Sequence, residues 1–284
     1  MKLLYTSDLH GSETHYERLL AVAESTRPDL VVLGGDLLPD DSALQPDRLG
    51  HGQPEYVRTR FRQIVGDLRR SSGCKGVLLI FGNHDWGSCV PAMGELASEG
   101  LVSILNPKEP LQIDGLSFLG YSCTPPTPWF VKDFERLDQP GDRPPLLGGA
   151  LWDARFSRPV QHGAAHLYEI APSIAEDLAS VKEPAAPWVF VVHAPPHATH
   201  LDRAYGNHSY GSKAIREAIE RLQPLLSLHG HIHESPKVSG HWRDALGETV
   251  SVNPGQETLT LNYVLVDIDV AEKNLSRIEH GQQS

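Results

Sequence analysis

Short polar motifs along this chain each follow an apolar run, and together they carry the side chains that proteins use to bind divalent metal ions. They supply carboxylates, one amide and several imidazoles. Two divalent cations held by such ligands can clamp the attacking and leaving oxygens of an in-line displacement at phosphorus. Phosphate-ester chemistry is therefore our first hypothesis. The motifs are Asp8-Leu9-His10, Gly34-Gly35-Asp36, Gly82-Asn83-His84-Asp85, His193 and Gly230-His231-Ile232-His233.

One aspartate could serve two cations, because a carboxylate has two oxygens. Asp36 is the candidate bridge, since it follows Gly34-Gly35, where the backbone can approach closely. Asp8 and His10 stand two positions apart at the end of an apolar run, so both side chains can face one ion.

The other candidate ligands are nitrogen donors and one neutral oxygen donor. His231 and His233 repeat the spacing of two positions, Asn83 offers an amide oxygen, and His193 adds a further imidazole. Mixed nitrogen and oxygen ligands suit Mn, Fe, Zn, Co or Ni rather than Mg or Ca. The absence of a cysteine ligand argues against a purely structural zinc site. We therefore expect two divalent transition-metal ions, with a hydroxide between them as the nucleophile.

His84 is left without an obvious metal to bind, and Asp85 follows it directly. An imidazole beside the substrate can stabilise the phosphoryl oxygens or protonate the leaving oxygen. We expect Asp85 to fix the tautomer and orientation of His84.

The elements that must position these residues are visible as apolar runs. Runs at residues 3–6, 30–33, 77–81, 189–192 and 225–228 read as strands buried on both faces, and several end at a motif. Helical periodicity lies between them, with stripes starting at Tyr16, Phe61, Met93 and Ala214. Ligands would then gather at the carboxyl ends of the strands, as in open α/β sheets.

The second half of the chain has shorter strands, at residues 111–113, 116–119, 249–252 and 259–267, which predict a second sheet packed on the first. Residues 39–53 read as a polar loop, and the tail after Val270 as little more than a surface turn. Residues 122–163 form a Pro-rich insert with several aromatic residues. Trp129, Phe130 and Trp152 could stack on a nucleobase or anchor the insert, and we slightly favour anchoring. The 284 residues suit a single domain that carries this insert.

The charge and the cysteine content indicate which binding partners and which cellular compartment to expect. The formal net charge is −11, and no broad basic patch is visible, so a long nucleic acid is not an expected partner. Three cysteines without CxxC spacing favour a reducing compartment. The apolar start is too short for a signal peptide, and no stretch is long enough to cross a membrane. We expect a cytoplasmic protein acting on a small phosphorylated substrate, with oligomerisation left open.

The motif set DLH, GGD, GNHD, H and GHIH resembles that of the calcineurin-like metallophosphoesterases, from Asp8 to about Gly255. Further stretches look like the Icc-related phosphoesterases and the class III cyclic nucleotide phosphodiesterase-like group. These stretches are His193-Ala194-Pro195-Pro196, Asp202 with Gly206-Asn207-His208 and Gly211-Ser212, Gly230 to Glu234, and Asn253-Pro254-Gly255.

The resemblance implies an α/β fold, a four-layer α-β-β-α sandwich of two mixed sheets. It implies one metal on Asp8, His10, Asp36 and His233, and another on Asp36, Asn83, His193 and His231. His84 would be the catalytic histidine. The implied substrate is a phosphodiester, cyclic nucleotides included, or a small phosphorylated metabolite.

Weaker candidates and other functions remain open at this point. His208 precedes a predicted helix N-terminus that could bind a phosphate, although a structural hydrogen bond is equally plausible. A nuclease acting on short nucleic acid is disfavoured by the acidic charge. A non-catalytic scaffold would tolerate lost ligands, whereas this chain has all of them.

Overall fold

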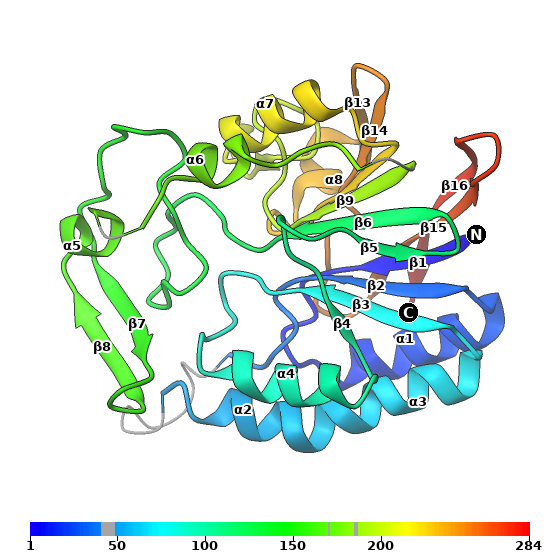
Figure 1. Ribbon diagram of the computed structural model, residues 1–284, viewed down its shortest axis with the longest axis horizontal. Helices are drawn as coiled ribbons and strands as arrows, with labels where there is room; N and C mark the ends of the chain where they lie inside the picture. The colour runs from blue at the N-terminus through cyan, green and yellow to red at the C-terminus, as the bar shows by residue number, and fades with distance from the viewer. Residues whose placement is uncertain (41–48, 170, 185–186) are drawn as a thin grey trace.

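Two six-stranded mixed sheets pack face to face in the computed structural model, which describes residues 1–40, 49–169, 171–184 and 187–284 (Figure 1). The first sheet has the order β16 (Asn274–Gln283), β15 (Leu261–Asp269), β1 (Lys2–Thr6), β2 (Leu30–Gly34), β3 (Gly76–Ile80) and β4 (Ser103–Ile104). The second has the order β13 (Arg243–Leu246), β14 (Thr249–Val252), β12 (Leu226–Leu228), β9 (Trp188–Val192), β6 (Leu116–Tyr121) and β5 (Leu111–Ile113).

Helices cover the outer face of each sheet (Figure 1). Helices α1 (Glu13–Thr26), α3 (Arg62–Ser72) and α4 (Cys89–Ser98) pack on the first sheet, preceded by the short α2 (Gly52–Tyr56) and the π-helix η3 (Val57–Phe61). Helices α6 (Ile174–Ala179) and α7 (Lys213–Leu222) pack on the second sheet. The expected α-β-β-α sandwich is confirmed.

Three buried apolar layers hold these four layers together, and strand alternation divides residues among them. Val189 and Val191 of β9 face the first sheet, where they join Tyr5 of β1 in the layer between the sheets. Phe190 lies on the other face of β9, in the layer beneath α6 and α7. Both faces of the strand are thus buried, which explains its continuous apolar run.

Local sequence signals set the starts of three helices. The Ser12 and Ser212 side chains accept hydrogen bonds from His15 N and Ile215 N at the starts of α1 and α7. Ser173 and Glu176 form a capping box at the start of α6.

Two expectations about the C-terminal region are wrong. β15 pairs antiparallel with β1 and so belongs to the first sheet, not the second. The tail, expected as a surface turn, forms β16 and pairs with β15 from Leu261↔Gln283 to Asp269↔Asn274. β16 is an edge strand with largely exposed side chains, so its sequence stays polar, and its pairing rests on backbone hydrogen bonds that leave no apolar pattern.

The insert folds as a separate lobe beside the sandwich (Figure 1). It contains an antiparallel hairpin of β7 (Gly149–Asp153) and β8 (Arg158–His162), followed by α5 (Ala164–Glu169). Of the polar loop expected at residues 39–53, residues 41–48 lie outside the described part of the chain, and α2 begins at Gly52.

Candidate functional site

The loops that follow β1 and β2 run side by side and bring the first candidate ligands together. Backbone hydrogen bonds continue beyond the strands, from Asp8 N to Gly35 O at 3.0 Å and from His10 N to Asp36 O at 2.9 Å. The side chains of Asp8, His10 and Asp36 therefore arise from adjacent loops at the carboxyl ends of two parallel strands.

Four of the candidate ligands have a left-handed backbone, which non-glycine residues rarely adopt. The φ angles are +58° at Asp8, +45° at His10, +51° at Asp36 and +67° at His231. Each such residue costs about 1–3 kcal/mol, and such strain gathers at functional sites, where surrounding contacts enforce it.

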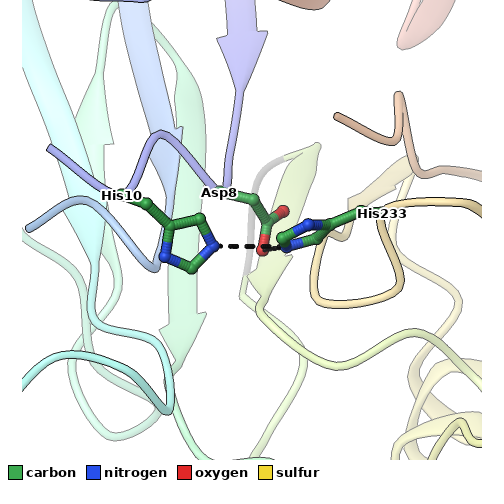
Figure 2. A group of neighbouring side chains, drawn as sticks. All are labelled: Asp8, His10 and His233. Atoms are coloured by element: carbon green, nitrogen blue, oxygen red, sulfur yellow. Dashed lines mark hydrogen bonds and ion pairs between the residues drawn. The ribbon is translucent and has the colours of Figure 1, made fainter. Parts of the chain in front are cut away.

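Asp8, His10 and His233 form the first cluster and point toward one another (Figure 2). His233 Nε2 lies 3.2 Å from Asp8 Oδ1 and 3.3 Å from His10 Nε2. Asp8 comes from the loop after β1, and His233 from the loop between β12 and α8 (Ser235–Ser239). The structure thus joins ligands that are more than two hundred positions apart in sequence.

Asp36 and His193 meet Asp8 in a second cluster. Asp36 Oδ2 lies 3.3 Å from His193 Nε2 and 4.0 Å from His10 Nε2, so a single oxygen faces an imidazole from each side. The ring of His231 lies next to that of His193, with centroids 5.3 Å apart.

Buried polar atoms at this site lack hydrogen-bond partners. Nε2 of His193 and both amide atoms of Asn83 are buried and unbonded. His193 Nδ1 is 2.8 Å from the Gly34 carbonyl, so Nε2 is the ring nitrogen that would face a cation once its proton is displaced. Unsatisfied buried polar groups are costly, and a cation would satisfy His193 Nε2 and the Asn83 amide oxygen.

Burial keeps two of the candidate imidazoles neutral. It lowers the pKa of His10 to about 4 and the pKa of His231 to about 3, with His193 adding to the effect on His231. Both rings are therefore ready to donate a lone pair at neutral pH.

Two other imidazoles are held by carboxylates. Burial alone would lower the pKa of His193, but the adjacent Asp36 raises it to about 9. His233 behaves similarly, because Asp8 outweighs burial and raises the pKa of His233. In return, these imidazoles lower the pKa of both carboxyl groups below their ordinary values, although burial opposes this.

His84 is half-buried at the open side of the clusters, and its backbone N donates to Asp36 Oδ1 at 2.8 Å. Its ring lies 4.8 Å from that of His10 between centroids. The Asp85 side chain binds the loop backbone in this structure, and its expected effect on His84 stays a prediction. Its carboxylate accepts hydrogen bonds from Gly82 N and Leu38 N, because it is fully buried beneath the loop, so it holds the backbone rather than the imidazole.

Sequence reasoning missed several residues that hold the ligand loops. The Asn253 amide donates to the carbonyls of Leu201, Gly230 and Ile232, so it fixes the His231 loop rather than merely forming a turn. Its position directly after a buried strand was the one available signal.

Two glutamines hold the other loops. Gln256 donates to Ser7 O at 3.0 Å. Gln53 donates to His84 O at 2.9 Å and accepts from Trp86 N.

The structure places the weaker candidates His208, Trp152 and Trp129 in three different surroundings. His208 is exposed on β11 (His208–Ser209), which pairs with β10 (Arg203–Ala204), and no described contact links it to the ligand clusters. Trp152 anchors the insert as expected, packing its ring near His51. Trp129 does not anchor the insert in this way, because 52% of its surface is exposed. Its ring lies 4.7 Å from the His84 ring, measured between centroids.

Clefts border the clusters on the His233 side. One of about 260 Å³ is lined by Asp8, His10 and His233 and reaches His15 of α1. Another of about 790 Å³ starts at His233 and is lined farther out by Trp242. The site is therefore open to a ligand of small-molecule size.

The model of the calcineurin-like phosphoesterases matches residues 1–235, and the chain belongs to this family. Its members hydrolyse phosphate esters with divalent metal ions. The chain is thus a metallophosphoesterase, as its motifs indicated. No curated protein matches the sequence significantly.

Solved structures share the fold at low sequence identity. The protein TT1561 of Thermus thermophilus is 17% identical, with a TM-score of 0.58 over 99% of this chain and 97% of that one. A dimetal phosphatase from Danio rerio is 12% identical, with a TM-score of 0.50 over 94% of this chain and 92% of that one. Within the described residues, the helices are all too short or too polar to cross a bilayer.

Proposed function

We propose that the protein is a dinuclear metal-dependent phosphohydrolase acting on a phosphodiester or a small phosphorylated metabolite. The observation that carries the proposal is the position of Asp36 Oδ2, which lies 4.0 Å from His10 Nε2 of the first cluster and 3.3 Å from His193 Nε2 of the second. An oxygen placed between two ligand clusters is what a shared ligand of two cations requires.

The donor set fits two such cations. One would take Asp8, His10, Asp36 and His233, and the other would take Asp36, Asn83, His193 and His231. The unbonded Asn83 amide oxygen and His193 Nε2 support the second site, because without a cation both atoms would stay buried and without a hydrogen-bond partner. Bound Mn, Fe, Zn, Co or Ni would supply Lewis acidity and a hydroxide nucleophile near neutral pH.

The residues of the chain have distinct tasks in this proposal. Neutral His10 and His231 donate lone pairs, while Asp8 and Asp36 offset the positive charge of the cations. His84 stands beside the clusters, where its ring can hold a phosphoryl oxygen or give a proton to the leaving oxygen.

Turnover of bis-p-nitrophenyl phosphate by Mn²⁺-loaded protein tests the proposal. We expect hydrolysis that stops after chelation and returns when Mn²⁺ is restored. Two metal ions per chain should accompany full activity, measured by elemental mass spectrometry. Full activity with only one ion per chain would refute the proposal. Absence of activity with every transition metal tested would also refute it.

A further inference from the structure

We infer that Trp129 of the insert is a substrate-recognition residue that binds a planar aromatic group of the phosphate ester. This inference rests on the proposed function and adds a substrate class to it. It concerns the side of the site opposite the His233 clefts, where the insert meets the loop that carries His84.

A row of rings leads from the insert across the open side of the ligand clusters. The Trp129 ring lies 4.7 Å from that of His84, His84 lies 4.8 Å from His10, and His10 lies 5.1 Å from His233, all between centroids. Trp129 is therefore the next side chain beyond His84, within reach of a group attached to a phosphate held there.

Trp129 keeps 52% of its surface exposed although it packs against His84. A tryptophan recruited only as an anchor would bury most of its apolar surface, as Trp86 does at 1% exposure. The exposed part of an indole offers a flat apolar surface, on which aryl groups and nucleobases stack without sequence-specific hydrogen bonds.

A buried polar network holds the loop that presents Trp129. The Lys132–Glu135 ion pair is almost completely buried, with Nζ 2.9 Å and 3.0 Å from the two carboxylate oxygens. Glu135 also accepts from Thr127 N and from Tyr168 OH. Trp129 N in turn donates to Thr127 Oγ1 at 3.2 Å. Such a pair adds little net stability but specifies one conformation, which suits a recognition loop.

A second contact locks this loop to the His84 loop. The Asp133 carboxylate accepts hydrogen bonds from Gly87 N and from Trp152 N, both at 2.9 Å. The insert and the loop after β3 are thereby joined through one half-buried side chain. Trp129 is consequently fixed relative to His84, and the surface beside the reacting group is preformed rather than assembled by the substrate.

Two inhibitors with the same head group can distinguish two roles of Trp129. In one role it binds an aromatic group of the ligand, and in the other it only packs against His84. Phenylphosphonate and methylphosphonate both present a phosphonate to the metal ions, but only the first carries a ring. Their dissociation constants are measured by titration calorimetry on Mn²⁺-loaded protein. Trp129→Ala should weaken phenylphosphonate about tenfold and methylphosphonate less than about twofold. Trp129→Phe should restore most of the difference.

Phe156→Ala is the matched control, because Phe156 is an exposed aromatic residue of the same insert whose ring contacts Arg155 and Arg158. It should leave both constants unchanged. Equal weakening of the two inhibitors by Trp129→Ala, or none, would overturn the inference. Failure of the proposed function would show separately, as wild-type protein that neither binds two ions nor hydrolyses bis-p-nitrophenyl phosphate.

Discussion

Asp36 and His193 come from different sheets of the sandwich and meet with Oδ2 and Nε2 3.3 Å apart. Asp36 follows β2 of the first sheet, and His193 follows β9 of the second. The proposed metal centre therefore depends on how the two sheets pack, because neither sheet holds all of the candidate ligands.

Replacing the shared carboxylate tests this dependence. Asp36→Asn should reduce metal content from two ions to less than one per chain, because both sites lose a charged oxygen. Activity toward bis-p-nitrophenyl phosphate should fall at least about a thousandfold. Asp67→Asn, at an exposed pair with Arg70, should change neither quantity. Retention of two ions by Asp36→Asn would show that Asp36 is not shared.

His84→Ala should separate catalysis from metal binding. The His84 backbone N bonds to Asp36, and this bond survives the substitution. Metal content should stay at two ions while kcat falls about 10²- to 10⁴-fold, the usual contribution of a positioned acid or base. If the variant loses both ions instead, His84 is a ligand or a support for ligands.

Metal binding should release protons at neutral pH. Asp36 raises the pKa of His193 to about 9 despite burial, so this imidazole is protonated at pH 7 until a cation displaces the proton. Affinity for Mn²⁺ should therefore increase with pH up to about 9, by about tenfold per pH unit for each proton released. Calorimetry in buffers of different ionisation enthalpy counts these protons.

The same competition predicts loss of activity below roughly pH 6, as ligand histidines protonate. His208→Asn provides the control, because His208 lies on the exposed β11 and should not alter the profile. An affinity for Mn²⁺ that stays constant between pH 6.5 and 8.5 would contradict the assignment of His193.

Gly230 tests the close approach of the ligand loops. A Cβ at this position would collide with Asp8 Oδ2 and Ser7 Oγ, so Gly230→Ala should displace the Asp8 carboxylate. We expect metal affinity to fall by at least about tenfold while the fold persists. Gly94→Ala in α4 is the matched control, since a Cβ there meets nothing within 4 Å. It should raise stability by about 0.5–1 kcal/mol.

The buried ion pair of the insert should be sensitive to removal of one partner. Lys132→Met leaves the Glu135 carboxylate buried without its cation, which should cost about 3–5 kcal/mol in unfolding free energy. Lys132→Met combined with Glu135→Met should recover most of this loss. Thermal unfolding of the three proteins gives the comparison, and a Tm of Lys132→Met equal to that of the native chain would contradict it.

The pH dependence of this variant has a defined sign. Burial already raises the pKa of Glu135 above 4.5, and loss of Lys132 raises it further. The folded state then binds the Glu135 proton more tightly than the unfolded chain. Stability therefore falls as pH rises from about 4.5 through the raised value. The deficit of Lys132→Met should be largest at neutral pH.

Much of the fold and the candidate metal ligands could be proposed from the sequence because both depend on local signals. Apolar runs predicted the central strands, and the helical stripes starting at Tyr16 and Ala214 predicted α1 and α7. The motifs at strand ends predicted the ligand types, which do not depend on how the elements pack.

What could not be predicted depends on contacts between distant segments. The left-handed backbone of His231 is imposed by neighbouring loops, and Asn253 gains its role from three carbonyls of other segments. β16 left no apolar pattern because its pairing is made by backbone groups. Trp129 and Trp152 have the same residue type in the same insert, and only packing distinguishes their surroundings.

The pairing of β1 with β15 has a consequence for synthesis of the protein. β1 precedes the loop that carries Asp8 and leaves the ribosome first, yet its antiparallel neighbour β15, and Gln256, which bonds to Ser7, emerge only near the end of translation. The proposed metal centre would not be completed on a nascent chain that stops short of β15. Truncated translation products should therefore lack a functional centre, even when they contain every ligand from Asp8 to His233.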